Sequence, residues 1–207
     1  MSARREDVAK EFTAKGRATR DRIVAKATEI VYENGVANTS LQDVQQAAGV
    51  SGSQMYHYFP DKALLVHAVI DRQREILLAR QAQLLDRLDS LEAIRAWCDY
   101  VVRGARRRRG RGGCPIGSLA SELSDHDAVA RAELAETFQQ WSGLIRDGLR
   151  AMQERGELSA EADPEQLGYA LFAAAQGGLL IAKAMRDTAP LEMALDAVID
   201  RIASLAA

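Results

Sequence analysis

Apolar residues recur every three or four positions along most of this chain, as they do on the buried face of a helix. Over residues 18–34, for example, Ile23, Ala27 and Val31 follow this spacing, and Gly35 ends the segment. No segment alternates apolar and polar residues in the manner of a half-buried strand. We therefore predict an all-α fold of about nine helices, over residues 18–34, 41–48, 51–58, 61–88, 90–106, 115–123, 126–154, 164–185 and 190–205.

Residues 39–62 predict two short helices joined by a tight turn. Ser40 caps the first helix, and Asp43 follows three residues later, which is the spacing of a capping box. Gly49 ends this helix, because glycine enters a left-handed turn without steric cost. The second helix stops before Pro60, since the residue before a proline is disfavoured in the helical region. Such a pair is a helix-turn-helix, in which the second helix enters the major groove of DNA.

The same stretch resembles the DNA-binding domain of the tetracycline-repressor (TetR) family. The resemblance is carried by Ala48-Gly49-Val50-Ser51 in the turn and by Met55-Tyr56-His57-Tyr58-Phe59-Pro60-Asp61-Lys62 after it. It extends over about residues 17–65 and is only architectural beyond them. Met55 stands where many members carry leucine, and His57 where many carry another polar or aromatic residue.

This resemblance implies a DNA-binding domain with an N-terminal arm over residues 1–62 and a ligand-binding and dimerisation domain over residues 63–207. It implies a cytoplasmic homodimer that binds a palindromic operator in double-stranded DNA. A small-molecule inducer would release this repressor from the operator, although the sequence does not distinguish a repressor from an activator. We expect no enzymatic activity, cofactor, metal or membrane partner.

The second helix of the pair is the candidate for reading bases. Glutamine pairs bidentately with adenine, and serine contacts several base edges. In the family that this stretch resembles, the tyrosine corresponding to Tyr56 touches a phosphate, and the lysine corresponding to Lys62 touches another. The alternative is that Tyr56 and Tyr58 only pack. The candidate DNA contacts are Thr39, Ser40, Ser51, Gly52, Ser53, Gln54, Tyr56, His57 and Lys62.

Composition and charge agree with this assignment without adding much to it. The chain has 207 residues, 47% of them hydrophobic, which suffices for one large domain or two small ones. The net charge is −2, and residues 1–62 carry nine Lys or Arg and eight Asp or Glu, so phosphate contacts would come from a few placed groups. Residues 1–16 form either a solvated tail or an arm along the DNA. We expect no secretory signal and no apolar run of about 18 residues.

A stripe of small residues marks residues 164–205 as the candidate dimer surface. Small residues let helices approach closely, which serves an intrachain core as well as an interface. The four-helix dimer bundle of the family favours the interface, so we expect Gly178→Arg to give monomers. The stripe consists of Ala170, Ala173, Ala174, Gly177, Gly178, Ile181 and Ala182.

A ligand cavity, if the core is not simply filled, is expected in the C-terminal part. Pockets are mostly apolar with a few polar groups. Aromatic residues make up only 5% of the chain, which favours a largely filled core. The candidate lining residues are Trp97, Tyr100, Cys114, Phe138, Trp141, Tyr169, Phe172 and Gln176.

Cys114 follows an arginine-rich run, residues 106–111, that reads as a loop, and it precedes Pro115 at an expected helix start. Positive charge and a helix N-terminus both lower a thiol pKa, so an electrophile-responsive repressor switched through Cys114 is the alternative function. An ordinary buried thiol is the competing interpretation, and Cys98 on an apolar face is expected to be one. The segment 113–120 resembles that of the LmrA/YxaF branch of the TetR family.

Two further readings have little support. His126 lies close to acidic residues, but the spacing matches no recognised set of metal ligands, and a helix cap is the simpler interpretation. No pairing of a nucleophile with a base indicates an enzyme. The two cysteines give no disulfide framework, which fits a protein with reduced thiols.

Overall fold

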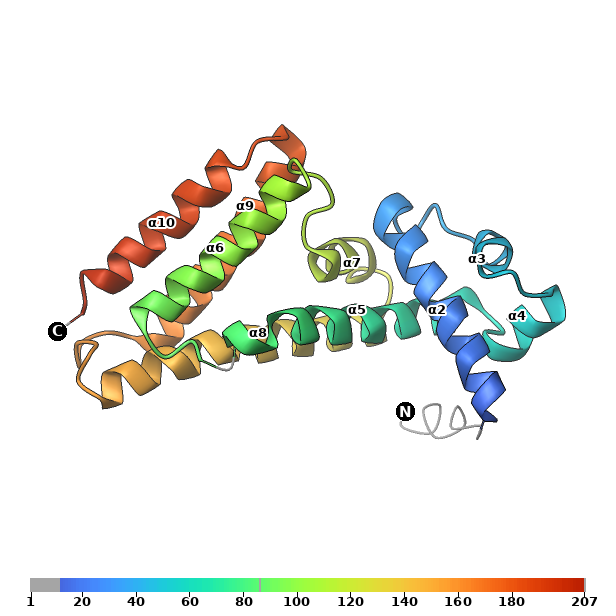
Figure 1. Cartoon of the computed structure of the whole chain (residues 1–207), viewed down its shortest axis with the longest axis horizontal. Coiled ribbons are helices and arrows are strands. Elements are labelled where there is room, and N and C mark those ends of the chain that lie inside the picture. Colours follow the sequence, from blue (N-terminus) through green and yellow to red (C-terminus); the bar gives the residue numbers. More distant parts are fainter. Residues whose placement is uncertain (1–11, 86, 207) are drawn as a thin grey trace. The chain divides into compact units, whose positions relative to one another are not determined.

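The computed structural model describes residues 12–85 and 87–206, and within them the regular elements are nine helices and one isolated bridge between Leu158 and Ala206 (Figure 1). The expected all-α fold is confirmed. The chain divides into two compact units, Met1–Arg72 and Gln73–Ala207. This division lies inside helix α5, ten residues after the boundary at residue 62. Most of the proposed arm, residues 1–11, is outside the described residues.

The first unit contains α2 (Ala14–Asn34), α3 (Leu41–Ala48), α4 (Gly52–Tyr58) and the beginning of α5 (Lys62–Leu85). Each helix contributes apolar side chains to one core, which is why the four segments fold together. Arg22 on α2 also donates a hydrogen bond from Nε to the Ala48 carbonyl at 2.9 Å, which links α2 to the last residue of α3. The core side chains with no exposed surface are Ile23, Ala27, Val44, Met55, Val69 and Ile70.

Local hydrogen bonds hold the two short helices in place. Ser40 and Asp43 form the expected capping box at the start of α3. Gly49 ends α3 in the left-handed region with φ of 61°, as we expected for a glycine at this position. Ser51, one of the two serines that could cap this helix, caps α4. It also forms a second capping box with Gln54, and this reciprocal bond was not expected. The helix-turn-helix geometry therefore comes largely from contacts within three or four residues.

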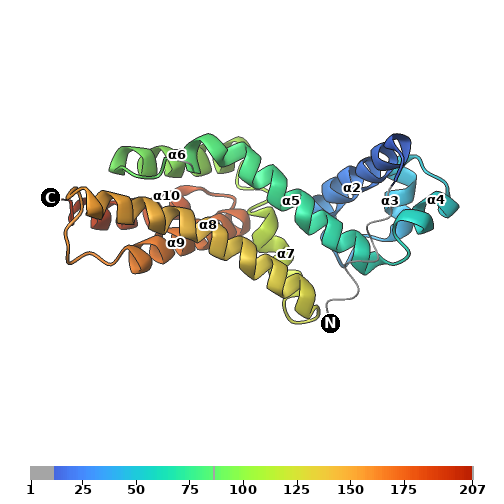
Figure 2. The same cartoon turned by 90° about the horizontal axis from the view of Figure 1, so that it is seen from below.

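The second unit contains α6 (Leu91–Arg107), α7 (Pro115–Leu123), α8 (Ala128–Glu154), α9 (Pro164–Met185) and α10 (Ala189–Ala203), together with the end of α5. Helix α9 packs against α10, α8 and α6, and α7 packs against α8 (Figures 1 and 2). Several boundaries differ from expectation, by one to three residues. Asp127, not an earlier residue, caps α8, and α6 extends through Arg107, so the arginine run begins inside a helix.

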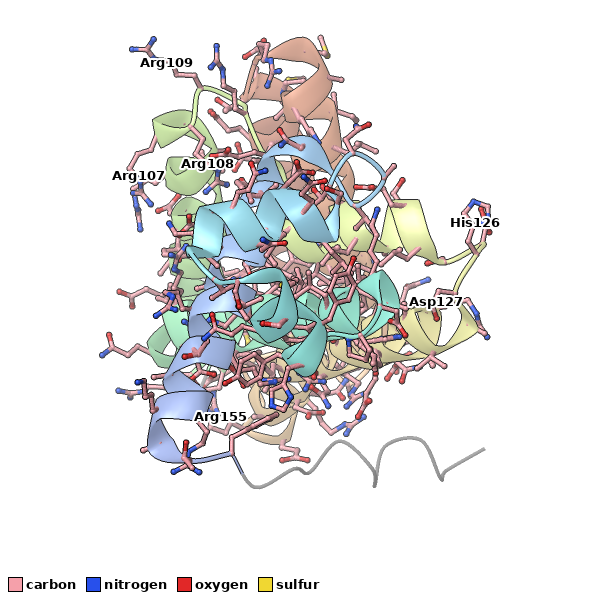
Figure 3. All side chains as sticks on the ribbon, turned by 90° about the vertical axis from the view of Figure 1, so that its right-hand side faces the viewer. Arg107, Arg108, Arg109, His126, Asp127 and Arg155 are labelled. Atoms are coloured by element: carbon pink, nitrogen blue, oxygen red, sulfur yellow. The ribbon has the colours of Figure 1, made fainter. Side chains whose placement is uncertain are left out.

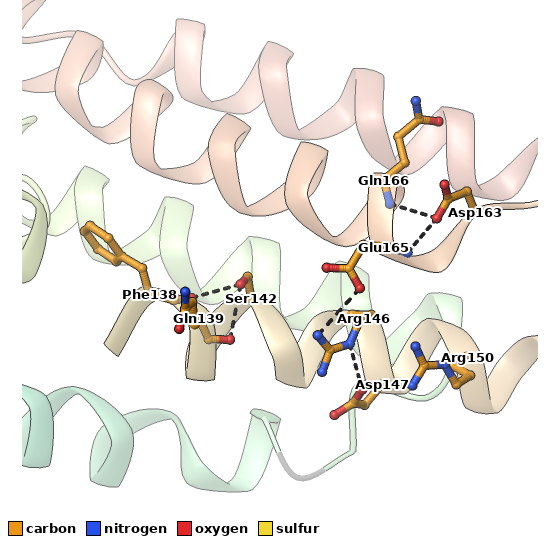
Figure 4. A network of polar contacts seen from close by, with 9 residues as sticks. All are labelled: Phe138, Gln139, Ser142, Arg146, Asp147, Arg150, Asp163, Glu165 and Gln166. Atoms are coloured by element: carbon orange, nitrogen blue, oxygen red, sulfur yellow. Dashed lines mark hydrogen bonds and ion pairs between the residues drawn. The ribbon is translucent and has the colours of Figure 1, made fainter. Parts of the chain in front are cut away.

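Polar contacts fix the approach of α9 to α8 (Figure 4). Asp163 caps α9 by accepting from the backbone N–H groups of Glu165 and Gln166. Arg146 on α8 pairs with Asp147 at 2.9 Å and reaches Glu165 at 3.6 Å. Asp147 and Glu165 are exposed and Arg146 is half-buried, so the ion pairs contribute orientation more than stability.

Helix α9 is the one described helix that is long and apolar enough to cross a membrane, judged by length and composition alone. Its best 18-residue window has a mean hydropathy of 1.3, which is more apolar than we expected for any segment of this chain. However, 44% of that window is buried inside the protein. A central helix of a water-soluble bundle has the same properties, so this helix is weak evidence for a membrane segment.

Candidate DNA-binding and ligand-binding sites

The second helix of the pair, α4, presents a polar face to solvent. Ser53, Gln54, Tyr56 and His57 are exposed, whereas Met55 has no exposed surface and anchors the helix in the core. Gly52 at the first turn is half-buried. The exposed side chains are therefore those that we expected to meet DNA.

Gln54 has a second role that bears on base recognition. Its Oε1 accepts the Ser51 backbone N–H at 3.0 Å, and its own N–H donates to Ser51 Oγ at 3.2 Å. The Ser51 hydroxyl also lies 2.9 Å from that of Ser53. A bidentate contact from Gln54 to adenine would require the side chain to leave this capping box, since Oε1 is one of the two atoms needed.

The aromatic residues at the end of α4 differ in their exposure to solvent. Tyr56 is 60% exposed, whereas Phe59 is 2% exposed and lies beneath Arg20, whose Cζ is 5.4 Å from the ring centroid. Tyr58 is half-buried and packs against Phe12 at 5.1 Å between ring centroids. Of the two tyrosines, Tyr56 is the exposed one.

Three candidates lie beside this helix. Ser40 is exposed, and Lys62 is half-buried at the first residue of α5. Thr39 is only 3% exposed, and its hydroxyl donates to the Gly35 carbonyl at 2.8 Å. The Thr39 side chain is therefore committed to the turn before α3, and we no longer consider it a phosphate contact.

Four of the aromatic candidates for ligand binding form one cluster in the second unit, which we call the aromatic cluster. Trp141 lies edge-to-face against Trp97 at 6.4 Å and against Phe172 at 5.2 Å, and Phe138 contacts Phe172 at 5.7 Å. Trp97, Trp141 and Phe172 are buried, and Phe138 is half-buried. The cluster joins α6, α8 and α9 across the unit.

Two aromatic candidates are not part of this cluster. Tyr169 is 49% exposed on the outer face of α9, so it does not face the interior as we expected. Tyr100 is half-buried on α6, and none of the ring contacts found in residues 12–85 and 87–206 includes it. Conversely, Gln81 was not expected, yet its Oε1 accepts the Trp97 indole N–H at 2.8 Å. A polar residue that interrupts the apolar face of α5 was the available signal.

The expectation of a reactive, accessible Cys114 is wrong. The side chain is only 8% exposed, and burial raises the pKa of the thiol above its ordinary value. The Gly117 N–H, which donates to Sγ at 3.4 Å, and the Ile116 backbone both lower the pKa. The Gln176 side chain and the Arg108 charge lower it too, but all of these together have less effect than burial. Cys114 does cap α7, with Pro115 next, as predicted. Proximity in sequence to arginines thus has less effect than the packing around the sulfur atom.

We expect both thiols of the folded protein to alkylate slowly with iodoacetamide at pH 7. Burial, followed by the charges of Asp99 and Asp196, raises the pKa of Cys98 to about 12, and Cys114 is shifted in the same direction. A raised pKa leaves little thiolate, which is the reactive form. Mass spectrometry should show at least about tenfold slower labelling than in urea. Fast labelling of native Cys114 would restore the thiol-switch hypothesis.

An exposed apolar surface lies on α9 and α10, and we call it the α9–α10 face. Tyr169, Leu180, Ile181 and Met185 on α9 are 44–67% exposed, and Met193 on α10 is 71% exposed. A Cβ added at Gly177 would meet nothing within 4 Å. Large apolar side chains grouped in this way mark an interaction surface.

Gly178 does not belong to this face, which corrects our expectation. A Cβ at Gly178 would lie 2.6 Å from Cδ1 and 2.8 Å from Cα of Leu191 on α10. Ala182 is likewise buried. The small residues of α9 therefore serve two surfaces, one inside the chain and one open to solvent.

The arginine run ends in a loop that packs on the end of α9. Gly110 is buried, its φ is 68°, and its carbonyl accepts from Arg186. Arg106 pairs with Glu192 at 2.9 Å, whereas Arg107 and Arg109 point away from the ribbon (Figure 3). His126 lies exposed in the turn before Asp127, and no group of three or more His, Cys, Asp or Glu side chains that could hold a metal occurs in the described residues.

Comparison with known proteins covers both units. A family model described as "Bacterial regulatory proteins, tetR family" matches residues 23–69, and one described as "Tetracyclin repressor-like, C-terminal domain" matches residues 90–198. The HTH-type transcriptional repressor DhaR of Mycobacterium sp. strain GP1 is 28% identical over 185 residues, which cover 88% of this chain and 91% of DhaR.

Two further relatives agree. The HTH-type transcriptional regulator YxaF of Bacillus subtilis, whose branch the segment 113–120 resembles, is 24% identical over 84% of this chain and 89% of its own. A solved TetR transcriptional regulator from Chloroflexus aurantiacus J-10-FL is 27% identical, covers 94% of this chain and 98% of its own, and superposes with a TM-score of 0.81. The chain, with a helix-turn-helix unit and a helical C-terminal unit that each match, belongs to the TetR family of bacterial transcriptional regulators.

Proposed function

We propose that this protein is a cytoplasmic homodimeric repressor that binds an inverted-repeat operator and releases it when a small molecule binds the second unit. The observation that carries the proposal is the exposed polar face of α4, held on a buried Met55 and capped by Ser51. A short helix presented in this way fits the major groove. The repressor DhaR supports repression in place of activation.

A dimer follows from the α9–α10 face. Large apolar side chains such as Leu180 and Met193 are otherwise left in water, where their exposure is unfavourable. An interface between two copies is isologous, so it has two-fold symmetry. Two α4 helices related by such an axis would read half-sites about 34–36 Å apart. The operator is therefore proposed to be an inverted repeat.

Selection from a random duplex library tests this function directly. The full chain at moderate salt should enrich one inverted repeat with two equal half-sites. Enrichment of nothing above background would contradict DNA recognition by α4. Enrichment of a single, non-repeated site would contradict binding as a two-fold dimer but would still support DNA recognition by α4.

Three substitutions separate positioning contacts from base contacts. Lys62→Ala and Tyr56→Phe should weaken binding to all duplexes alike, and Lys62→Ala should lower the salt slope by about one, because phosphate contacts carry no sequence information. Gln54→Glu retains an acceptor for the Ser51 N–H, so the capping box survives while the amide donor is lost. It should change the preferred base at one position in each half-site, by about 1–3 kcal/mol.

Fluorescence anisotropy on the selected operator and on single-base variants measures both effects. A Lys62→Ala protein that prefers another sequence at unchanged affinity would contradict its phosphate role. If Gln54→Glu leaves the base preference unchanged, Gln54 does not read a base and serves only in the capping box with Ser51.

A further inference from the structure

We propose that the regulatory ligand is an uncharged aromatic molecule with hydrogen-bond acceptors, held by the Trp141 indole N–H and the Gln176 amide beside the aromatic cluster. This inference rests on the proposed ligand-responsive function and specifies its chemistry.

The first observation is a pair of buried donors, Trp141 Nε1 and Gln176 Nε2, for which no hydrogen-bond partner lies within ordinary distance and angle limits. The Gln176 amide does act on the Cys114 thiol, whose pKa it lowers, so Trp141 is the donor that is wholly unused, and its side chain is only 3% exposed. A buried donor without a partner is unfavourable, and native proteins contain few of them. The neighbouring Trp97 provides an internal comparison, because its indole N–H donates to Gln81. Within the protein, the indole N–H of Trp97 therefore has a hydrogen-bond acceptor, whereas the indole N–H of Trp141 has none.

The two donors lie in the same part of the unit. The centroids of the Phe172 and Trp141 rings are 5.2 Å apart. Gln176 follows Phe172 by four residues on α9, so Phe172 and Gln176 lie on the same face of that helix. On the other side, Gln176 Oε1 would lie 3.2 Å from a Cβ added at Gly117, in the first turn of α7. A molecule that accepts from both donors would therefore be flanked by aromatic rings and by α7.

The surrounding charges favour a neutral molecule. Among the described residues, no lysine, arginine or histidine is buried, and Arg108, whose charge acts on Cys114 at the start of α7, is itself exposed. A buried anion would therefore lack a directly paired, buried cation. A cationic group, in turn, supplies no acceptor to either donor. Ketones, esters, ethers and amides of aromatic compounds meet all of these conditions.

Nuclear magnetic resonance of the two indole N–H groups tests the proposal on the full chain. The protein has two tryptophans, so labelling with ¹⁵N-tryptophan gives two indole signals, which Trp97→Phe and Trp141→Phe assign. The probes share one bicyclic frame: indanone, which is a neutral acceptor; indane, which has no acceptor; indane carboxylate; and aminoindane. Indanone should move the Trp141 indole proton downfield and leave the Trp97 proton in place. It should bind about tenfold more tightly than indane, as one well-formed hydrogen bond allows.

Variants provide the matched control. Trp141→Phe retains the ring and removes the donor, so it should abolish the preference for indanone over indane. The same change at Trp97 removes a donor that is already paired, so the preference should persist. Gln176→Leu, which removes the second donor without changing either indole, should reduce the preference by several-fold and serves if Trp141→Phe does not fold.

Three outcomes would overturn the proposal: equal or tighter binding of a charged probe, a shift of Trp97 but not Trp141, or no binding by any probe, in which case the donors serve only water. The proposed function fails separately. If indanone binds through Trp141 but leaves operator affinity unchanged even at saturation, the site chemistry stands and regulation through this site does not.

Discussion

Gly178→Ala is expected to destabilise the folded protein by about 2–3 kcal/mol, whereas Gly177→Ala, one residue earlier, should leave its stability unchanged or slightly higher. A Cβ at Gly178 would approach Cα of Leu191 to 2.8 Å, so α9 and α10 must separate to admit it. The backbone cannot yield as the end of a flexible side chain can. At Gly177 a Cβ meets nothing within 4 Å, and alanine is the better helix former.

Urea unfolding followed by circular dichroism measures both variants. The measurement is made at several protein concentrations, because association of folded chains raises apparent stability. Equal midpoints for the two variants would contradict the intrachain role of Gly178. Gly178→Arg should accordingly fail to fold instead of giving the folded monomers that the small-residue stripe predicted.

Leu180→Glu is expected to give folded monomers that bind the inverted-repeat operator at least about 100-fold more weakly. Leu180 is 67% exposed within one chain, so the substitution costs the monomer little. At a self-complementary interface the carboxylate appears twice, once in each copy, and each is desolvated without a compensating cation, which opposes association strongly. A dimer binds the operator tightly because it contacts two half-sites at once. A monomer contacts only one half-site and loses this gain in affinity.

Val129→Glu is the matched control. Val129 is 50% exposed on α8, away from the α9–α10 face, and a carboxylate in the first turn of a helix is tolerated well. Sedimentation velocity should show monomers for Leu180→Glu and an unchanged dimer for Val129→Glu. A dimer for both variants would move the interface elsewhere, and a monomeric unsubstituted protein would remove the argument for paired half-sites.

Interactions between residues close in sequence account for what could be predicted of the DNA-binding unit. The Ser40 cap, the Asp43 partner and the left-handed Gly49 each depend on neighbours within three or four positions. The same holds for the helix periodicity and for Pro115 at the start of α7. The Ser51–Gln54 capping box obeys this rule too. Ser51 and Ser53 were both possible caps of this helix, but Gln54 was interpreted only as a base contact.

Predictions about the second unit failed where they depended on which elements meet. Helix α9 carries apolar or small residues on nearly every side, so spacing alone does not separate the face that meets Leu191 from the face open to solvent. Tyr169 was placed inside for the same reason, although it is exposed.

By itself, the sequence of this protein determined the all-α class, the helix-turn-helix with its caps, and the aromatic residues from which a cluster could form. Only the tertiary structure decided that Gly178 is an intrachain contact and that Cys114 is buried with a raised pKa. It also decided that the Trp97 indole N–H donates to Gln81, whereas the Trp141 indole N–H has no hydrogen-bond partner. The physical reason is the distance along the chain between the residues that interact. Capping and periodicity act between neighbours along the chain, whereas burial, desolvation and close packing depend on residues brought together from distant segments.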